Sequence, residues 1–357
     1  TTTTRPRRDD LPPPTCTTSG MPEVVQVGGG RSSLRGRVVV VTGGSSGIGR
    51  ATALACARRG ACVVVAARSA EQVEEVAESC RRRGGPALAV PVDVTDERAV
   101  AGLARAAVER FGRIDVWVNA AAVGILGRFD QVPVADVRRL LDVNAVGALN
   151  GARAAVPVMR RQGGGVLVDV ASLLGAPVAA PYMGAYAMSK AALTTFDDVL
   201  RRELALRGDR RIAVCTVLPT GVDTPFFRNA ANHSGRALRS LPPVATPERV
   251  ARAVVRAVRR PRDRVLVGPY ARSMAAAHAL APGLLRRGIA RRTDRVYLER
   301  GRPRLPQAGN LYTPTGARAA LHGGRHGGAR TAARRAAAAA AAVFAVRAAL
   351  RGSRTPR

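Results

Sequence analysis

The sequence predicts an α/β fold built on a doubly wound parallel sheet, and three observations support this prediction. Short apolar runs alternate along residues 37–270 with longer stretches of helical periodicity, as in successive strand-helix-strand units. The apolar runs are nearly continuous, as expected for strands that are covered on both faces. A glycine-rich turn follows the first run and precedes the first helical stretch. Together these features indicate a Rossmann-like sheet with helices on both sides.

The expected elements follow one another in a regular order. The strands are short apolar runs, at residues 38–41, 61–67, 87–92, 114–118, 166–170, 212–218 and 265–267. The helices show apolar residues at helical spacing, from the glycine-rich turn to Arg59 and then at residues 71–83, 97–111, 136–161, 185–206 and 247–259. Gly60 is expected to end the first helix, because glycine commonly follows a helix end.

Composition divides the 357 residues into three parts, enough for one large domain with extensions. Residues 1–36 form a Thr/Pro/Arg-rich segment that we expect to be disordered, and residues 37–270 form the α/β domain. Residues 271–357 form an Arg/Ala/Gly-rich extension, expected to be partly disordered, that carries half of the formal net charge of +32. The chain lacks an initiator methionine, so Met21 is a candidate natural start, which the intact mass of the native protein would test.

The basic extension allows two interpretations. It could attract nucleic acid or an anionic membrane, or it could be a solvated, arginine-biased tail. We favour the tail, because no aromatic-basic interleaving or nucleic-acid module is visible. The alanine-rich run at residues 336–346 is shorter than the roughly 20 residues that span a bilayer, although it could lie on a membrane surface.

The cysteine and histidine content points to a cytoplasmic protein without a metal site. Five cysteines with no Cys-x-x-Cys pair argue against a disulfide framework and for a reducing compartment. No secretory signal is apparent. His322 and His326 have no third ligand nearby, so we expect no bound metal.

Tyr186 and Lys190 stand out as a candidate catalytic pair. Lys190 is the only lysine in the chain, and it follows Tyr186 by four residues, which places both side chains on one face of a helix. A free tyrosine has a pKa near 10, and lowering it to about 7 requires about 4 kcal/mol. One positive charge about 4 Å away supplies roughly that energy at an effective dielectric constant of about 20. The pair could therefore transfer a proton near neutral pH, unless the spacing is accidental.

The glycine-rich turn has the spacing Gly43-x3-Gly47-x-Gly49. Glycines allow a positive φ and a close approach of the backbone to a ligand. The free N–H groups and the dipole at the start of the following helix favour an anion. The turn is therefore a candidate site for a pyrophosphate.

With these motifs in place, the chain resembles the short-chain dehydrogenases/reductases over about residues 35–270. The motifs that carry the resemblance occur in the order typical of that family: Thr42–Gly43–Gly44–Ser45–Ser46–Gly47–Ile48–Gly49, Asp93–Val94, Asn119–Ala120–Ala121–Ala122, Asn144, Ser172, Tyr186, Lys190, and Pro219 to Thr224. The resemblance implies an oxidoreductase that interconverts a ketone or aldehyde and an alcohol with a nicotinamide dinucleotide.

The resemblance also implies a role for each catalytic residue. Tyr186 is the general acid/base, and Lys190 depresses its pKa and binds the nicotinamide ribose. Ser172 polarises the substrate carbonyl, and Asn144 holds a water that links Lys190 to solvent. Contacts to the cofactor are implied for Gly43, Ser45, Ser46, Gly47, Ile48, Gly49, Arg68, Ser69, Asp93, Val94, Asn119, Ala121, Tyr186, Lys190, Pro219, Val222 and Thr224.

Two segments depart from the family pattern. The family sequence Asn-Asn-Ala-Gly reads Asn119–Ala120–Ala121–Ala122 here, and the family Pro-Gly reads Pro219–Thr220. Both segments line the nicotinamide pocket in the family, so we expect altered loops there.

The residues after the second strand predict NADP(H) as the preferred cofactor over NAD(H). An acid near this point accepts the ribose 2′-hydroxyl in NAD enzymes, whereas an arginine suits a 2′-phosphate. Here the strand is followed by Arg68 and Ser69, with no acid before Glu71. The alternative is that Arg68 is one surface arginine among many.

The substrate pocket is expected to be apolar. Its wall should run from Leu173 to Met183, with Phe226 and Phe227 in a lid, and Arg228 could instead bind a carboxylate. We expect a homo-oligomer that pairs through the two long helices, as in family relatives. The alternative function is a cofactor-binding sensor or scaffold whose basic tail contacts nucleic acid or a membrane.

Overall fold

The computed structural model describes residues 33–175, 178–238, 244–296, 298–303, 305–315 and 320–324. The predictions for Met21, for the rest of the N-terminal segment up to residue 32 and for the alanine-rich run fall outside these residues. Among the described helices, none combines the length and the apolar character that a bilayer crossing requires.

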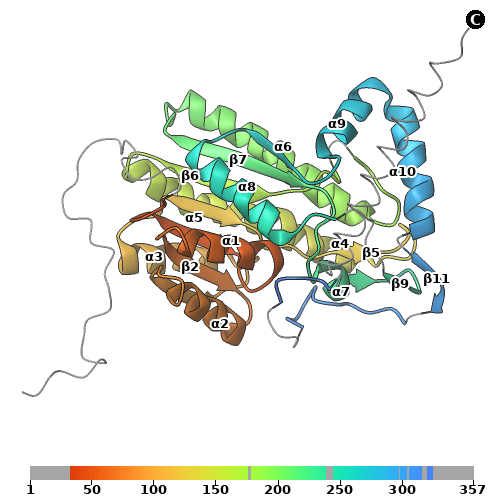
Figure 1. Cartoon of the computed structure of the whole chain (residues 1–357), viewed down its shortest axis with the longest axis horizontal. Helices are drawn as coiled ribbons and strands as arrows, with labels where there is room; N and C mark the ends of the chain where they lie inside the picture. Colours follow the sequence, from red (N-terminus) through yellow and green to blue (C-terminus); the bar gives the residue numbers. More distant parts are fainter. Residues whose placement is uncertain are drawn as a thin grey trace, which may run out of the picture.

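A seven-stranded parallel sheet forms the centre of the molecule, in the strand order β10-β7-β6-β4-β1-β2-β3 (Figure 1). Its strands are β1 Val38–Thr42, β2 Cys62–Ala67, β3 Ala87–Pro91, β4 Val116–Asn119, β6 Gly165–Val170, β7 Ile212–Pro219 and β10 Arg264–Val267. The strand order reverses direction between β1 and β4. In doubly wound sheets, ligands bind beyond the carboxyl ends of the strands at such a reversal.

Helices cover both faces of the sheet, and the alternation of side chains along β1 shows how (Figure 1). Val39 and Val41 pack with α1 Gly47–Ala57, α2 Ala70–Arg81 and α8 Pro247–Arg259. Val38 and Val40 belong to the opposite core, which includes residues of α3 Glu97–Phe111, α5 Gly147–Arg161 and α6 Gly184–Leu206. The predicted α/β fold class is therefore confirmed, and each predicted strand and helix is present within a few residues.

One predicted helix, over residues 136–161, is wrong in its continuity. It consists of α4 Val134–Leu141, a π-helical turn η1 Asp142–Val146, and α5. Periodicity did not reveal the turn, because one wide turn shifts the apolar stripe only slightly. Such turns often occur at functional sites, and this one contains Asn144.

Several short or late elements were not predicted. They are β5 Ile125–Leu126, α7 Phe226–Asn229, β8 Ala231–Asn232, β9 Arg236–Leu238, α9 Ala271–Leu280, α10 Pro282–Val296 and β11 Leu298–Pro303. Part of the basic extension is thus folded as helices, and in Figure 1 these helices (blue) stand at the carboxyl edge of the sheet, where α9 follows β10. Cys56, Cys80 and Cys215 are free and buried.

Two carboxyl groups are buried together behind the sheet ends. Asp169 on β6 and Asp197 on α6 are fully buried neighbours, and Asp169 Oδ2 and Asp197 Oδ1 have no other hydrogen-bond partner among the described residues. Asp197 also accepts a hydrogen bond from Thr216 Oγ1 at 2.6 Å, and Asp169 accepts one from Asn119 Nδ2 at 2.7 Å. Burial and the neighbouring Asp169 together raise the pKa of Asp197 to about 10. One proton is therefore shared by the pair at neutral pH.

This pair makes the stability of the fold pH-dependent. The folded-state pKa of Asp197 lies above its ordinary value of 3.8, so the stability that protonation supplies is complete below about pH 4 and is lost as pH rises toward 10. Asp197→Asn keeps the neutral, hydrogen-bonding form at every pH. Its free energy of unfolding relative to the wild type should rise by about 2–3 kcal/mol between pH 5 and pH 7, at 1.36 kcal/mol per pH unit.

Denaturant unfolding at both pH values measures this difference. Asp263→Asn serves as the control, since the Asp263 side chain is 83% exposed, and its effect should be the same at pH 5 and pH 7. An Asp197→Asn effect that does not change with pH would contradict the shared proton.

Candidate active site

A cavity of about 530 Å³ opens at the carboxyl ends of the central strands. Its volume lies in the range of small-molecule sites. It is lined by most of the residues that the sequence singled out: Gly43, Ser45, Ser46, Gly47, Ile48, Gly49, Arg68, Ser69, Asp93, Val94, Ala121, Ser172, Tyr186, Lys190, Pro219, Val222 and Thr224. Of the predicted set, Asn119 and Asn144 lie outside the lining, where they support it.

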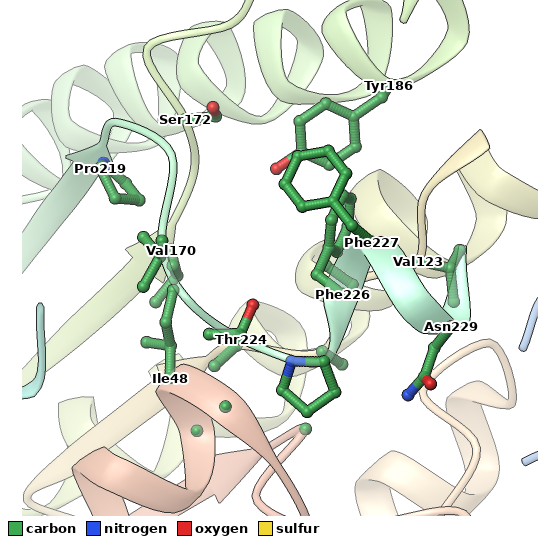
Figure 2. A pocket seen from close by; sticks show the side chains of 18 of the residues that line it. Ile48, Val123, Val170, Ser172, Tyr186, Pro219, Thr224, Phe226, Phe227 and Asn229 are labelled. Carbon is green, nitrogen blue, oxygen red and sulfur yellow. The ribbon is translucent and has the colours of Figure 1, made fainter. Parts of the chain in front are cut away.

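Ser172 and Tyr186 project into the same part of this cavity. Ser172 follows β6, and Tyr186 lies in the first turn of α6. Figure 2 shows the serine hydroxyl and the phenol oxygen facing one space, with Ile48 and Thr224 on its other side. Burial raises the pKa of Tyr186 to about 12, although a hydrogen bond with Ser172 lowers it. The phenol therefore carries its proton at neutral pH.

Lys190 lies one helical turn beyond Tyr186 and is 2% exposed. Its Nζ donates to the carbonyl oxygen of Val170 at 2.9 Å and lies 5.9 Å from the centroid of the Tyr186 ring. Burial lowers the pKa of Lys190 to about 8, although the charges of Asp169 and Asp197 raise it. The pKa of Tyr186 is therefore raised in this arrangement, opposite to the depression expected from Lys190, because burial of the phenol dominates and the ammonium turns toward Val170.

Asn144 supports the site from behind. In the π-helical turn its side chain pairs with the backbone of Val123, accepting from the N–H at 2.8 Å and donating to the carbonyl at 3.0 Å. It also donates to Ser189 Oγ at 3.0 Å, and this hydroxyl donates to the carbonyl of Tyr186. Asn144 thus ties the loop after β4 to the first turns of α6.

Asn119 has a comparable supporting role. It accepts from Trp117 Nε1 at 2.8 Å and donates to Asp169 and to the carbonyl of Ala148. Gly151 on α5 lies so close that a Cβ there would come within 2.6 Å of the Trp117 indole nitrogen. The asparagine therefore holds β4, β6 and α5 together directly behind the cavity.

The glycine positions of the glycine-rich turn leave no room for a Cβ atom. Gly43 has a φ of 64° and Gly47 a φ of 49°, in the left-handed region that favours glycine. A Cβ on Gly43 would approach the backbone nitrogen of Ala121 to 2.5 Å, and one on Gly47 would meet Thr224 at 3.1 Å. The turn thus brings bare backbone to the start of α1, as a bound pyrophosphate requires.

The departure at Thr220 is accommodated within the fold. Its side chain occupies the space that a Cβ on Gly268 would fill, and Gly268 has a φ of 126°. The Thr220 hydroxyl oxygen is buried and has no hydrogen-bond partner among the described residues. A second orphaned atom of the cavity wall is Asn310 Oδ1. Two buried, unpartnered polar atoms in this wall fit a polar ligand such as a dinucleotide.

Arg68 and Asp93 lie at the opposite end of the cavity from the phenol, after β2 and β3. Burial tends to raise the pKa of Asp93, but hydrogen bonds from Thr95 and an ion pair with Arg139 at 2.7 Å lower it overall. Asp93 is therefore a charged, anchored carboxylate. Arg68 donates to three backbone carbonyls of the C-terminal extension, a partner set that the sequence did not suggest.

The part of the cavity beyond Tyr186 is apolar, as expected. Phe226 packs edge-on against the phenol at 5.2 Å between ring centroids, and Phe227 packs against Phe226 at 5.3 Å. Figure 2 shows both rings beside Tyr186. Further wall residues are Leu173, Leu174, Val178, Ala180 and Met183. Arg228 is exposed and outside the lining, so the structure does not place it as a carboxylate reader.

Sequence reasoning missed the contribution of the C-terminal extension. Met274 of α9 and Ile289 of α10 line the apolar end, Arg292 of α10 adds a charged group to the lining, and Asn310, Pro314 and Thr315 line the end near Arg68. The only available signal was the unusually specific-looking run at residues 309–314 within a low-complexity tail.

Comparisons with known proteins agree with this geometry. The profile of the family described as short chain dehydrogenase matches residues 37–235. The "Uncharacterized oxidoreductase YxnA" of Bacillus subtilis is 36% identical over 255 residues, which cover 70% of each chain. The "Probable oxidoreductase EphD" of Mycobacterium tuberculosis is 35% identical over 280 residues, 73% of this chain but only 46% of that protein.

Solved structures show the same relationship. An alcohol dehydrogenase from the archaeon Thermococcus sibiricus, complexed with 5-hydroxy-NADP, matches with a TM-score of 0.57 and 27% identity, over 66% of this chain and 97% of that chain. The parallel-sheet fold is thus shared with this alcohol dehydrogenase. The chain belongs to the short-chain dehydrogenase family and is an NAD(P)-dependent oxidoreductase.

Proposed function

We propose that this protein interconverts a ketone or aldehyde and an alcohol on a fairly apolar small molecule, with Tyr186 as the general acid/base and NADP(H) as the preferred cofactor. The observation that carries the proposal is the meeting of Ser172, Tyr186 and Lys190 on one wall of a cavity whose far end is the glycine-rich turn. A sensor or scaffold needs no such convergence. The described part of the basic extension also packs around this cavity, which favours a role in the site.

The roles of the side chains follow from their protonation and placement. A bound nicotinamide cofactor would supply or accept the hydride at the carbonyl carbon. In the reducing direction the Ser172 hydroxyl donates a hydrogen bond to the carbonyl oxygen, and Tyr186 gives that oxygen its proton as the C–O double bond becomes single. The raised pKa of Tyr186 means that the phenol carries the proton needed for this step at neutral pH. Oxidation needs the phenolate, which Ser172 and the ammonium of Lys190 would stabilise.

The glycine-rich turn and the residues after β2 divide the cofactor between them in this proposal. The N–H groups at the start of α1 hold the pyrophosphate, and the end of the cavity near Arg68 holds the adenosine half. Arg68 uses both hydrogens of one Nη atom and one hydrogen of the other for backbone carbonyls. Its Nε–H and one Nη hydrogen have no acceptor among the described residues, and these two donors suit a 2′-phosphate.

The apolar wall indicates the class of substrate. Phe226, Phe227 and Met274 surround the space beyond the phenol, and no buried carboxylate lines it in the described part of the chain. An uncharged ketone or secondary alcohol with an apolar body fits such a wall, because desolvating a charge there would be costly.

We also propose that the protein pairs with a second copy through α5 and α6. These helices expose apolar side chains, namely Val146 just before α5, Leu149, Met188 and Val199. Light scattering of the purified protein should give the mass of a dimer or a larger assembly, and Leu149→Asp with Val199→Asp should reduce it toward the monomer. A monomeric wild type would contradict this.

Removal of the phenol oxygen tests the catalytic assignment. Tyr186→Phe should lower kcat for NADPH-dependent carbonyl reduction by about 10²–10⁴-fold, the usual contribution of a general acid, while NADPH still binds. Turnover of a broad carbonyl panel and fluorescence titration with NADPH measure both quantities. Tyr182→Phe makes the same change at a tyrosine outside the cavity lining, and its kcat should stay within about threefold of the wild type. Undiminished turnover by Tyr186→Phe would sink the assignment.

A charge reversal tests the cofactor preference. Arg68→Asp removes the cation that suits the 2′-phosphate and introduces an acceptor for a 2′-hydroxyl, so the ratio of kcat/KM for NADPH over NADH should fall by about 10²-fold or more. Arg105→Asp changes charge equally at an exposed position outside the cavity and should leave the ratio unchanged. If both variants retain the wild-type ratio, Arg68 does not read the phosphate.

A further inference from the structure

Residues 305–315, here called the strap, cross the end of the cavity that holds Arg68. In Figure 1 this blue segment runs from β11 past α7 toward α1 and α2. Three of its residues, Asn310, Pro314 and Thr315, line the cavity together with Arg68, Ser69 and Gln72. The strap lies outside the residues that match the family profile, 37–235. It is therefore a wall of the site that the family match does not include.

The strap is held by side chains that also belong to the cavity end. Arg68 donates to the carbonyl oxygens of Asn310 at 2.6 Å, Tyr312 at 3.0 Å and Leu311 at 3.3 Å. Arg139 donates through Nε to the Leu311 carbonyl at 3.1 Å, while its other nitrogens bind Thr95 and Asp93. One guanidinium thus faces the cavity and binds the strap, and the second connects the strap to the carboxylate after β3.

Packing keeps the strap in one register. Leu311 is 0% exposed and belongs to the core under α3 and α5. Gly309 has a φ of 56°, and a Cβ there would meet the backbone of Ala230, so only glycine allows this approach. The Tyr312 hydroxyl donates to Asp136 at 2.7 Å, and the backbone of Gln307 pairs with that of Asn232. A leucine in the core and backbone pairing on either side fix where Asn310 lies.

One side-chain atom of Asn310 lacks a hydrogen-bond partner. Its backbone N–H donates to the carbonyl of Asn229 at 2.8 Å, and its own carbonyl accepts from Arg68. Its side-chain Oδ1 is buried and receives no donor from any described residue. A buried acceptor without a partner costs about 1–3 kcal/mol, so native structures rarely keep one unless a ligand or water satisfies it.

We propose that the strap forms the adenosine-side wall of the cofactor site, that the Asn310 side chain accepts a hydrogen bond from a donor group of the adenosine half, and that Arg68 positions the strap while its two remaining donors hold the 2′-phosphate. This inference rests on the proposed function. The donor is either the amino group of the adenine ring or a ribose hydroxyl, which share the chemistry that Oδ1 lacks. Because Arg68 would contact both the strap and the phosphate, binding of NADP(H) and attachment of the strap stabilise each other.

The adenosine contact is tested with the full chain by equilibrium binding rather than by turnover. Asn310→Ala should weaken NADPH binding about tenfold by isothermal titration calorimetry, which corresponds to 1.4 kcal/mol. Thr313→Ala is the matched control, since this exposed strap residue lies outside the cavity lining, and its affinity should match the wild type. A second ligand, the NADPH analogue with hypoxanthine in place of adenine, lacks the amino donor.

The analogue separates the two donors. Loss of affinity on Asn310→Ala for NADPH but not for the analogue assigns the contact to the adenine amino group, and an equal loss for both ligands assigns it to the ribose. Equal NADPH affinity of Asn310→Ala and Thr313→Ala overturns this inference while leaving the proposed function intact. A wild-type chain that binds neither NADPH nor NADH overturns the proposed function and this inference with it.

The coupling through Arg68 has its own readout, cleavage of the strap by chymotrypsin at Tyr312. Saturating NADPH should slow cleavage of the wild type at this residue about tenfold, and NADH at equal saturation should slow it less. Arg68→Lys keeps a cation for the phosphate but loses the planar fork that spans three carbonyls. That variant should be cleaved faster than the wild type without ligand. If the cleavage rate is the same with NADPH and NADH, and the same for Arg68→Lys and the wild type, Arg68 does not connect the strap to the 2′-phosphate.

Discussion

The burial of one ammonium group organises the catalytic end of this protein. Lys190 is 2% exposed, and a cation so placed is tolerated only with polar partners around it. Its partners are the carbonyl of Val170 and the negative charge shared by Asp169 and Asp197. These groups come from β6 and α6, so the charge joins the end of the strand that precedes Ser172 to the helix that carries Tyr186. The hydrogen bond and the charge interactions of the Lys190 ammonium therefore help to fix the positions of Ser172, Tyr186 and Lys190 relative to one another.

The same carboxyl pair connects the site to the rest of the sheet. Asp169 binds Asn119 at the end of β4, and Asp197 binds Thr216 on β7. Arg201 donates to the Thr216 hydroxyl and to the carbonyl of Asp263 just before β10. One buried network therefore spans four neighbouring strands behind the cavity. Such a network is stabilising only when its members are satisfied together, and here one shared proton achieves this.

At the cofactor end the organising constraint is steric rather than electrostatic. The glycine-rich turn and the loop after β4 approach so closely that a side chain on Gly43 would collide with Ala121. Across the cavity, Arg68 binds backbone carbonyls of a strap that lies more than 240 residues later in the chain. Bare backbone on one side and a guanidinium with two remaining donors on the other create a crevice whose polarity changes along its length. Its phenol end is apolar, and its arginine end is suited to phosphate.

The sequence alone determined the sheet, most helices of residues 37–270 and the part of the cavity lining that comes from the glycine-rich turn and the Ser172, Tyr186 and Lys190 motifs. These features come from local patterns: apolar strands, a glycine turn after the first strand, and a tyrosine four residues before the only lysine. Local patterns can be recognised without knowing how the chain packs. The tertiary structure alone decided the protonation of Tyr186, the pairing of Asp169 with Asp197, the π-helical turn at Asn144 and the strap on Arg68. A pKa depends on burial, and a carbonyl that binds an arginine is chemically the same in every residue. Neither the pKa of a buried group nor the backbone partner of an arginine can be predicted from the order of the side chains. Both depend on the fold, which brings distant backbone and charged groups together.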